Sequence, residues 1–219
     1  MALDDGISKL LDSLEEADQL NNTILIFLSD NGGTINTYSN NAPLRGYKYM
    51  FGEGGIRVPL IVAWPGKFPG GMSSNSLASA MDIFPTLLDL LDSERPENLD
   101  GKSLVPLLKN KEIRGVHDHL CWSDGHDASV IRKGPWKLIS SNGWKHSNFQ
   151  LDEQGIARPA PDSKYPNGTV LFNLKQDIGE TTDVFSKHPE IVTELSALYD
   201  QWRSKMKSKS KKGKGKSSK

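Results

Sequence analysis

Three side chains that suit a metal ion and an anion lie in one segment of the chain, residues 23–65. Asp30 and Asn31 follow an apolar run at 24–28, and Lys48 lies in the polar loop that comes next. A carboxylate beside an amide oxygen provides ligands for Ca²⁺ or Mg²⁺, and a lysine ammonium can meet one oxygen of a tetrahedral anion. A simple turn would also account for Asp-Asn-Gly-Gly, but Lys48 in the same loop favours a site. The segment therefore predicts hydrolysis of an ester at sulfur or phosphorus.

Two arginines flank Lys48 and have different expected roles. Arg45 could also meet an anion and line a substrate pocket. Arg57 stands at the start of the second apolar run and close in sequence to Glu53. We therefore predict that Arg57 forms a structural ion pair with a carboxylate such as that of Glu53.

A group of imidazole and thiol side chains raises the question of a zinc site; its members are His117, His119, Cys121 and His126. The first three alternate in sequence and would share one face of an extended strand. The paired spacing of structural zinc sites is absent, so we predict that these are ordinary surface or core residues. His126 remains a candidate for lining the substrate pocket.

Buried secondary structure is expected to hold the site segment on both sides. Apolar residues at i, i+3, i+4 and i+7 predict an amphipathic helix over residues 5–20. The runs at 24–28 and 60–64 lack polar alternation, as do parallel strands buried on both faces. Open α/β sheets bind ligands beyond the carboxyl ends of such strands. The connection at 32–57 is long for a compact domain, which favours a functional loop.

After a helix predicted over 80–91, the pattern changes to short alternating segments. Lys133-Gly134-Pro135 indicates a hairpin turn, and residues 170–174 form a further predicted strand. Pro189 opens a predicted helix with one apolar face. We expect a small antiparallel sheet with one packed helix, and a variable loop at 140–167.

The change to short alternating segments and the basic end divide the chain into three predicted parts, which are an α/β core at 1–115, an α+β subdomain at 116–204 and a tail at 205–219. The tail holds eight of the 27 basic side chains and none of the 27 acidic ones, so we expect it to be disordered. One cysteine excludes an internal disulfide framework. No apolar run approaches the ~20 residues of a membrane span, and the first residues lack the pattern of a signal peptide. We therefore expect a soluble chain without a specific nucleic-acid partner.

Four stretches, in order, carry a resemblance to a known family: residues 23–33, 44–66, 81–88 and 171–180. With them the chain resembles the C-terminal part of a sulfatase of the arylsulfatase type, in the alkaline phosphatase superfamily. The resemblance implies an α/β fold, with part of a mostly parallel sheet and its helices, followed by a small antiparallel sheet and a C-terminal helix. Full-length relatives are commonly exported to the periplasm, the lysosome or the medium.

The resemblance also implies roles for individual residues. Asp30 and Asn31 match ligands of a divalent metal, usually Ca²⁺ and possibly Mg²⁺ in this chain, and Lys48 matches the lysine that contacts the sulfate of an aryl or carbohydrate ester. The family nucleophile is a formylglycine made within a Cys/Ser-x-Pro-x-Arg motif, which this sequence does not contain. Cys121 is followed by Trp-Ser-Asp and cannot replace it. We therefore expect half of an active site, an inactive chain when alone, and a missing N-terminal sulfatase portion as its partner.

Two alternatives remain open. One is a phosphodiesterase or phosphonate hydrolase of the same superfamily, which would differ in its nucleophile. The other is a non-catalytic protein that binds sulfated or phosphorylated polymers through the Lys-rich tail.

Overall fold

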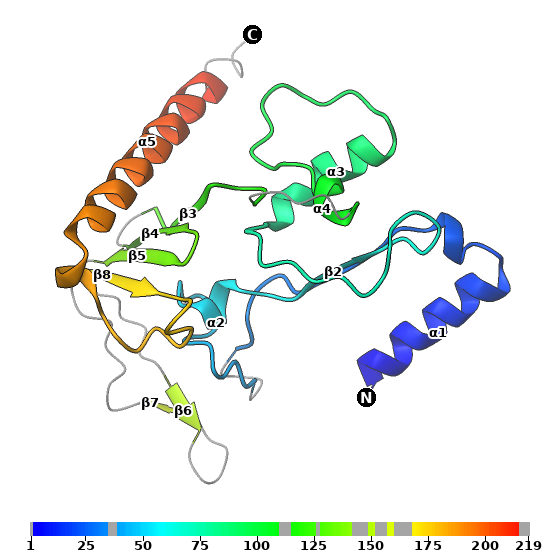
Figure 1. Ribbon diagram of the computed structural model, residues 1–219, viewed down its shortest axis with the longest axis horizontal. Coiled ribbons are helices and arrows are strands. Elements are labelled where there is room, and N and C mark those ends of the chain that lie inside the picture. The colour runs from blue at the N-terminus through cyan, green and yellow to red at the C-terminus, as the bar shows by residue number, and fades with distance from the viewer. Residues whose placement is uncertain are drawn as a thin grey trace. The chain divides into compact units, whose positions relative to one another are not determined.

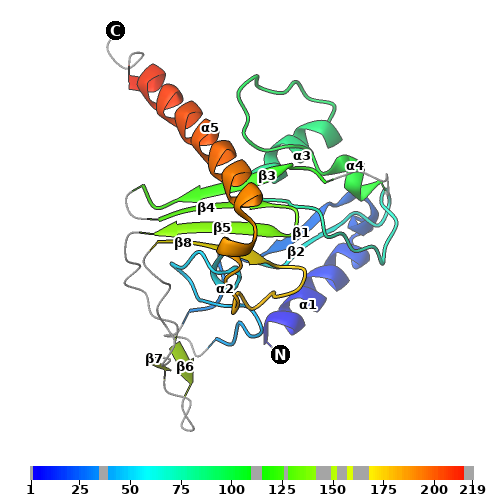
Figure 2. The same ribbon diagram turned by 60° about the vertical axis from the view of Figure 1, so that its left-hand side comes forward.

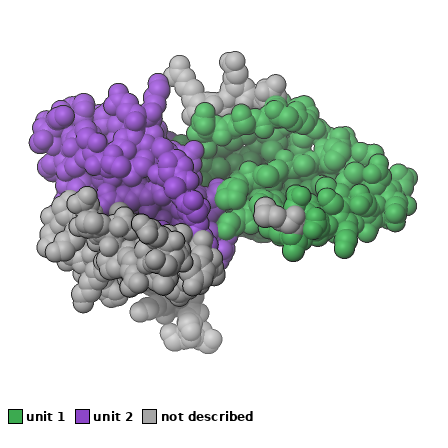
Figure 3. Space-filling view, turned by 90° about the horizontal axis from the view of Figure 1, so that it is seen from below, with its two compact units in different colours: residues 1–29, 59–117 green, residues 30–58, 118–219 purple. Residues whose placement is uncertain are grey.

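The computed structural model describes residues 2–34, 39–109, 115–125, 128–141, 149–151, 157–159 and 168–214, with backbone alone at 149–151, 157–159 and 207–214. Its residues form two compact units (Figure 3). Unit 1 comprises Met1–Ser29 and Pro59–His117, and unit 2 comprises Asp30–Val58 and Asp118–Lys219. The long loop that follows the first strand thus belongs to unit 2, whereas the sequence had grouped it with residues 1–115. The three-part domain division stays a prediction.

Unit 1 begins with helix α1, Ala2–Glu16, and a 3-10 turn at Leu20–Asn22 (Figure 1). The predicted helix is therefore confirmed, with its end four residues earlier than expected. Acidic Asp4 and Asp5 lie in its first turn, where they complement the positive end of the helix dipole. No residue of α1 is buried, so its apolar stripe has no complete cover within the described chain.

Strands β1, Leu25–Leu28, and β2, Leu60–Ala63, form a two-stranded antiparallel sheet in which Phe27 lies opposite Ile61. The prediction of a mostly parallel sheet is wrong for the part of the chain that the structure describes, where every strand pair is antiparallel. The missing polar alternation indicates that both faces should be covered, but it does not determine strand direction. The chain returns from β1 to β2 through a loop without a crossover helix, which allows antiparallel pairing.

The rest of unit 1 is a helical segment built around one buried carboxylate. The 3-10 turn Ala80–Asp82 leads into α3, Ile83–Leu90, with Pro85 in its first turn as predicted, and α4, Val105–Leu108, follows. The Asp82 carboxylate is fully buried and accepts hydrogen bonds from the backbone N–H groups of Ser79 and Lys102, at 2.8 and 2.7 Å. It also lies 2.8 Å from His117 Nε2. Asp82 therefore ties the start of this segment to its end.

Unit 2 contains a four-stranded antiparallel sheet in the order β3-β4-β5-β8. Its strands are β3, His119–Ser123, β4, Ala128–Lys133, β5, Trp136–Ser141, and β8, Gly168–Asn173. The predicted hairpin is confirmed, because Lys133 pairs with Trp136 across a turn of Gly134 and Pro135. A separate pair of short strands, β6, Phe149–Leu151, and β7, Ala157–Pro159, lies within the predicted variable loop.

Helix α5, Pro189–Lys214, covers one face of the four-stranded sheet (Figure 2). Leu195 and Tyr199 of α5 pack there with buried strand residues, which are Ile131, Leu138 and Leu171. The helix continues to Lys214, so the backbone of residues 205–214 is helical where the sequence predicted a disordered tail. Lysine has a good helix propensity, and extending an existing helix requires no new nucleation.

The other face of the sheet carries a second buried cluster of Val130, Ile139, Val170, Phe172 and Leu174. Phe51 from the long loop packs against this cluster. The loop that holds the candidate site residues is thus anchored on the sheet face opposite α5.

Within the described residues, no helix combines the length and the apolar character needed to cross a membrane.

Candidate site on the glycine-rich loop

The predicted ligand pair lies at the start of the long loop. Asp30 is exposed, and one of its carboxylate oxygens accepts the backbone N–H of Asn31 at 3.0 Å. Asn31 is half-buried, and its side-chain amide donates to the carbonyl of Gly32 at 2.9 Å. The loop geometry therefore presents a carboxylate and an amide oxygen on consecutive residues.

Lys48 is brought back to this pair through the backbone. Its N–H donates to the carbonyl of Gly33 at 3.0 Å, two residues beyond Asn31. The ammonium lies 5.4 Å from the centre of the Tyr49 ring. Three residues predicted from the sequence, Asp30, Asn31 and Lys48, are thus held in one loop cluster within unit 2.

Helix α2, Glu53–Ile56, is the centre on which the loop is assembled. The N–H of Gly32 donates to the carbonyl of Gly55 at 3.0 Å, and the N–H of Gly54 donates to the carbonyl of Arg45 at 2.7 Å. A Cβ at Gly32 would lie 1.6 Å from the carbonyl oxygen of Gly54, and one at Gly54 would lie 2.4 Å from that of Gly46. Backbone therefore packs on backbone here, and side chains at these two positions would push the contacting segments of the loop apart.

Asn41 holds the middle of the loop and was missed in the sequence. Its side-chain oxygen accepts the N–H of Gly33 at 3.0 Å, and its amide donates to the carbonyls of Gly33 and Gly46 at 3.1 and 3.0 Å. One asparagine in a loop rich in Asn and Gly carries no signal of such a role. The contacts alone identify it.

Arg45, predicted to meet an anion or line a pocket, donates through Nη1 to the backbone carbonyl of Glu180 at 2.6 Å. The structure therefore gives it at least one anchoring contact. His126, the other predicted pocket residue, lies outside the described residues.

The described members of the histidine and cysteine group lie apart from one another in their pairings. His117 pairs with Asp82 in unit 1, and His119 Nδ1 lies 3.1 Å from Asp118 in unit 2. Partial burial raises the pKa of the Cys121 thiol to about 12, which disfavours the reactive thiolate. Nowhere among the described residues do three His, Cys, Asp or Glu side chains gather as metal ligands would.

A buried group of charges lies directly behind the loop, and the sequence analysis did not find it. Glu53, Lys137 and Glu180 are each 0% exposed. Lys137 Nζ lies 3.0 Å from Glu53 Oε1 and 2.8 Å from Glu180 Oε1. Arg132 Nη1 donates to Glu53 Oε2 at 2.9 Å. Arg57 Nη1 lies 3.6 Å from the same oxygen, which confirms the predicted structural ion pair.

The two buried carboxyls have opposite pKa shifts. Burial alone would raise the pKa of Glu53, but the charges of Lys137, Arg132 and Arg57 and the Lys137 hydrogen bond outweigh it, so this pKa lies below its ordinary value. Burial raises the pKa of Glu180 above its ordinary value, although Lys137 opposes the shift. Glu53 is therefore the carboxylate that the surrounding cations hold most firmly in its charged form.

The donor set fits calcium in kind and falls short in number. Calcium takes roughly six to eight oxygen ligands, and the loop offers the carboxylate of Asp30 and the side-chain oxygen of Asn31. The ammonium of Lys48, whose backbone N–H binds Gly33, could balance an anion that shares the metal. The arrangement is thus suited to one side of a metal and oxyanion site.

Comparison with known proteins identifies the family. The family model described as Sulfatase matches residues 1–93. Arylsulfatase D of Homo sapiens is 39% identical over 240 residues, which cover 90% of this chain and 40% of the relative. The N-acetylgalactosamine-6-O-sulfatase of Bacteroides thetaiotaomicron is 31% identical over 214 residues, covering 91% of this chain and 40% of the relative.

The fold agrees with these matches. The crystal structure of the PsFucS1 sulfatase from Pseudoalteromonas sp. superimposes with a TM-score of 0.75 at 26% identity, over 94% of this chain and 42% of that one. The chain therefore spans about two fifths of the length of these relatives. The described fold is a mixed α/β sulfatase-like one. By homology, the chain belongs to the sulfatase family of hydrolases, in the alkaline phosphatase superfamily.

Proposed function

We propose that this chain supplies one side of a calcium-dependent sulfatase active site and forms the C-terminal portion of the fold. Asp30 and Asn31 act as metal ligands, and Lys48 contacts the sulfate of a sulfuric ester. The observation that carries this proposal is the hydrogen bond from the Lys48 N–H to Gly33, which keeps the lysine beside the ligand pair.

The chemistry of sulfate esters explains why these residue types are needed. The substrate is already an anion, and more charge builds on its oxygens as the sulfur–oxygen bond breaks. A bound calcium ion would act as a Lewis acid on the sulfuryl oxygens. Lys48 would stabilise the same charge with a fixed ammonium. The nucleophile, expected as a formylglycine, and the other metal ligands would come from the remaining portion of a sulfatase fold.

Substrate class rests on the relatives. The Bacteroides relative is named for a sulfated amino sugar, and a structure at 29% identity is titled as a complex with a neocarrahexaose. Another relative is named as an arylsulfatase, so the proposed substrate is an aryl or a carbohydrate sulfate. A phosphonate monoester hydrolase also superimposes, at a TM-score of 0.58 and 17% identity, which concerns the fold alone.

The exposed apolar surface of unit 1 supports a partner of the same fold. The eight residues of β1 and β2 are all apolar, yet Phe27 and Ile61 are 37% and 59% exposed. A two-stranded sheet is marginal by itself, and apolar faces on both sides require cover. We propose that the sulfatase portion absent from this sequence covers them. The chain should bind the dye ANS, and Phe27→Thr with Ile61→Thr should remove much of that binding; unchanged binding would contradict this partner.

Ligand binding by the loop can be tested without turnover. Calcium added to the ¹⁵N-labelled chain should shift the amide signals of Asn31 and Gly32, and Asp30→Asn should abolish the shifts. Asp92→Asn, an exposed acid in unit 1, is the matched control. Equal shifts in Asp30→Asn would overturn the ligand assignment.

The anion contact is tested in the same way. Inorganic sulfate added with calcium should shift the Lys48 amide, and Lys48→Ala should weaken binding while Lys9→Ala does not. Stronger binding of phosphate than of sulfate would favour the phosphoryl alternative. The chain by itself should not hydrolyse an aryl sulfate, and turnover that Lys48→Ala abolishes would show that the site is complete.

A further inference from the structure

The side chains of Glu53, Lys137 and Glu180, here called the buried triad, lose their hydration in the sheet core, which carries a large free-energy cost. Lys137 lies on β5 next to Leu138 and Ile139, two apolar core residues. Apolar side chains of similar size often stabilise such positions as well as an ion pair does, because desolvation offsets much of the attraction. Stability by itself therefore does not explain the triad.

Contacts from β4, from β5 and from the turn after β8 all hold one member of the triad, Glu53. The Glu53 side chain meets Lys137 of β5 and Arg132 of β4, at 3.0 and 2.9 Å. The backbone N–H of Glu53 donates to Glu180 Oε2, in the turn after β8, at 2.7 Å. Both the main chain and the side chain of the first residue of α2 are therefore held.

Glu180 is itself in a strained conformation. Its φ of +55° lies in the left-handed region, which residues other than glycine and asparagine rarely adopt. In this conformation its carboxylate meets Lys137 and Glu53, while its carbonyl accepts the Arg45 guanidinium at 2.6 Å. Strain of this kind persists where surrounding contacts over-determine it. The turn thus links the triad directly to the site loop.

From α2 the restraint passes into the loop through short backbone contacts. Gly54 binds Arg45, and Gly55 accepts from Gly32, the residue after Asn31. A Cβ on Gly55 would approach the Met50 carbonyl oxygen to 2.2 Å, so α2 packs directly against the loop backbone at this residue. Movement of α2 would displace the ligand pair and Lys48 together.

We infer that the buried triad is a positioning device, in which Lys137 and Glu180 of the C-terminal sheet region set the place of the Asp30-Asn31 pair and of Lys48. None of the three would touch the substrate, since all are fully buried. The inference deepens the proposed function and rests on it for the roles of the loop residues.

Charge balance gives a test that separates positioning from general support. Two carboxylates, of Glu53 and Glu180, face the buried cation of Lys137 and the partly buried cation of Arg132, and half-exposed Arg57 adds a further cation at 3.6 Å. Lys137→Met removes the buried cation while keeping an unbranched side chain. Adding Glu180→Gln removes one carboxylate, restores balance, and keeps an oxygen that can accept the Glu53 N–H.

Hydrogen exchange of single amides is the readout. Three amides report on the loop, those of Gly32, Gly54 and Lys48. In Lys137→Met their protection should fall by about 100-fold, as expected for local opening around an uncompensated buried charge. The amides of Val184 and Val192, in the same unit, should keep most of theirs. The double variant Lys137→Met/Glu180→Gln should recover most of the lost protection.

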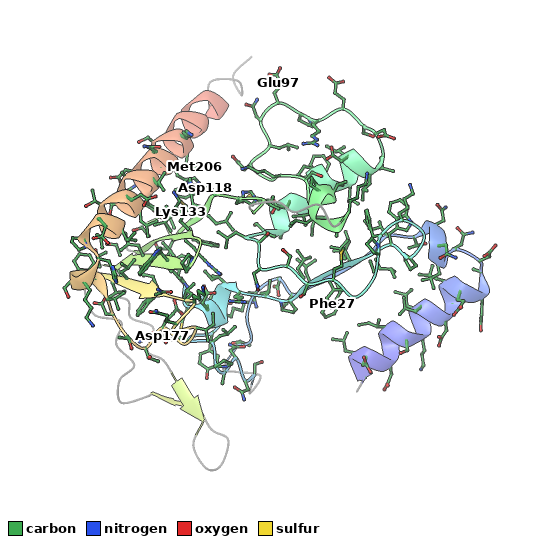
Figure 4. The ribbon with its side chains drawn as sticks, viewed as in Figure 1. Phe27, Glu97, Asp118, Lys133, Asp177 and Met206 are labelled. Carbon is green, nitrogen blue, oxygen red and sulfur yellow. The ribbon has the colours of Figure 1, made fainter. Side chains whose placement is uncertain are left out.

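The matched control is Lys133→Met on the same sheet, whose ammonium pairs at the surface with Asp118 and Glu194 at 3.5 and 2.6 Å (Figure 4). It should leave all five amides unchanged. A uniform fall across unit 2 in Lys137→Met, or no recovery in the double variant, would reduce the triad to structural support and refute the inference. If Lys137→Met does not fold, the double variant decides alone, because loop protection close to that of the wild type is then required.

The exchange experiment uses neither metal nor sulfate, so it stays valid if the loop binds neither. Calcium and inorganic sulfate are then added to wild type and Lys137→Met. Absent shifts in the wild type would contradict the proposed function, whereas equal shifts in both proteins would contradict the positioning role. Shifts in the wild type that weaken at least severalfold in the variant support both.

Discussion

The close packing of Gly32 against α2 leads to a specific prediction for Gly32→Ala. The added methyl carbon would lie 1.6 Å from the Gly54 carbonyl oxygen and 3.0 Å from the Cα of Gly55. Both neighbours are backbone atoms, so no side-chain rotation can make space. Overpacking of this kind costs about 1–3 kcal/mol, and the buried Gly32 N–H that loses its partner costs a further ~1–3 kcal/mol. We therefore expect a loss of roughly 2–6 kcal/mol, a large part of the ~5–15 kcal/mol typical of a domain.

Urea unfolding followed by NMR signals from each unit would measure this loss. Signals of unit 2 should disappear at lower urea in Gly32→Ala, and the Lys48 amide should lose its protection because its acceptor, Gly33, is displaced. Gly70→Ala is the control, since no atom lies within 4 Å of the added carbon there. Its effect should stay within about 0.5 kcal/mol. A Gly32→Ala variant as stable as this control would refute the claim that backbone contact fixes the loop.

Three further predictions concern single groups. The free energy of unfolding of unit 2 should rise as pH falls toward about 4.5, because Glu180 has a pKa above that ordinary value, and then decline at lower pH, because Glu53 has a pKa below it. In Glu180→Gln the first trend should vanish, and its persistence in a urea and pH series would show that another group causes it. Asp82→Asn should cost unit 1 about 2–4 kcal/mol in a thermal melt, since the buried charged acceptor of three contacts is lost. Cys121, whose pKa is raised to about 12, should react with DTNB at pH 8 far more slowly in the folded chain than in urea, and equal rates would contradict its burial.

Local pattern determined many of the elements. The apolar periodicity of α1, the hairpin at Gly134 and Pro135, and the apolar face of α5 all follow from the spacing of side chains and turn residues. Motifs around Asp30 and Lys48 gave the family, which the comparisons bear out. The roles assigned to those two residues stay proposals.

Strand direction was beyond what the local pattern could decide. A fully apolar run predicts cover on both faces, and such runs are typical of parallel strands, but the same composition suits an antiparallel pair. The pairing of β1 with β2 depends on how the intervening loop folds in unit 2, which is a property of contacts distant in sequence.

The sequence by itself determined which side chains within 23–65 can bind a metal ion and an anion, because carboxylate, amide and ammonium groups are evident from the residue types. The tertiary structure alone decided what holds them in place. Lys137 lies between apolar residues of a strand, a pattern that predicts a solvent-facing lysine. Its partner Glu53 is 84 residues away, and the backbone N–H of Glu53 binds Glu180 across 127 residues. Burial and pairing are created by the packing of the loop on the sheet, and no local pattern in the chain encodes them.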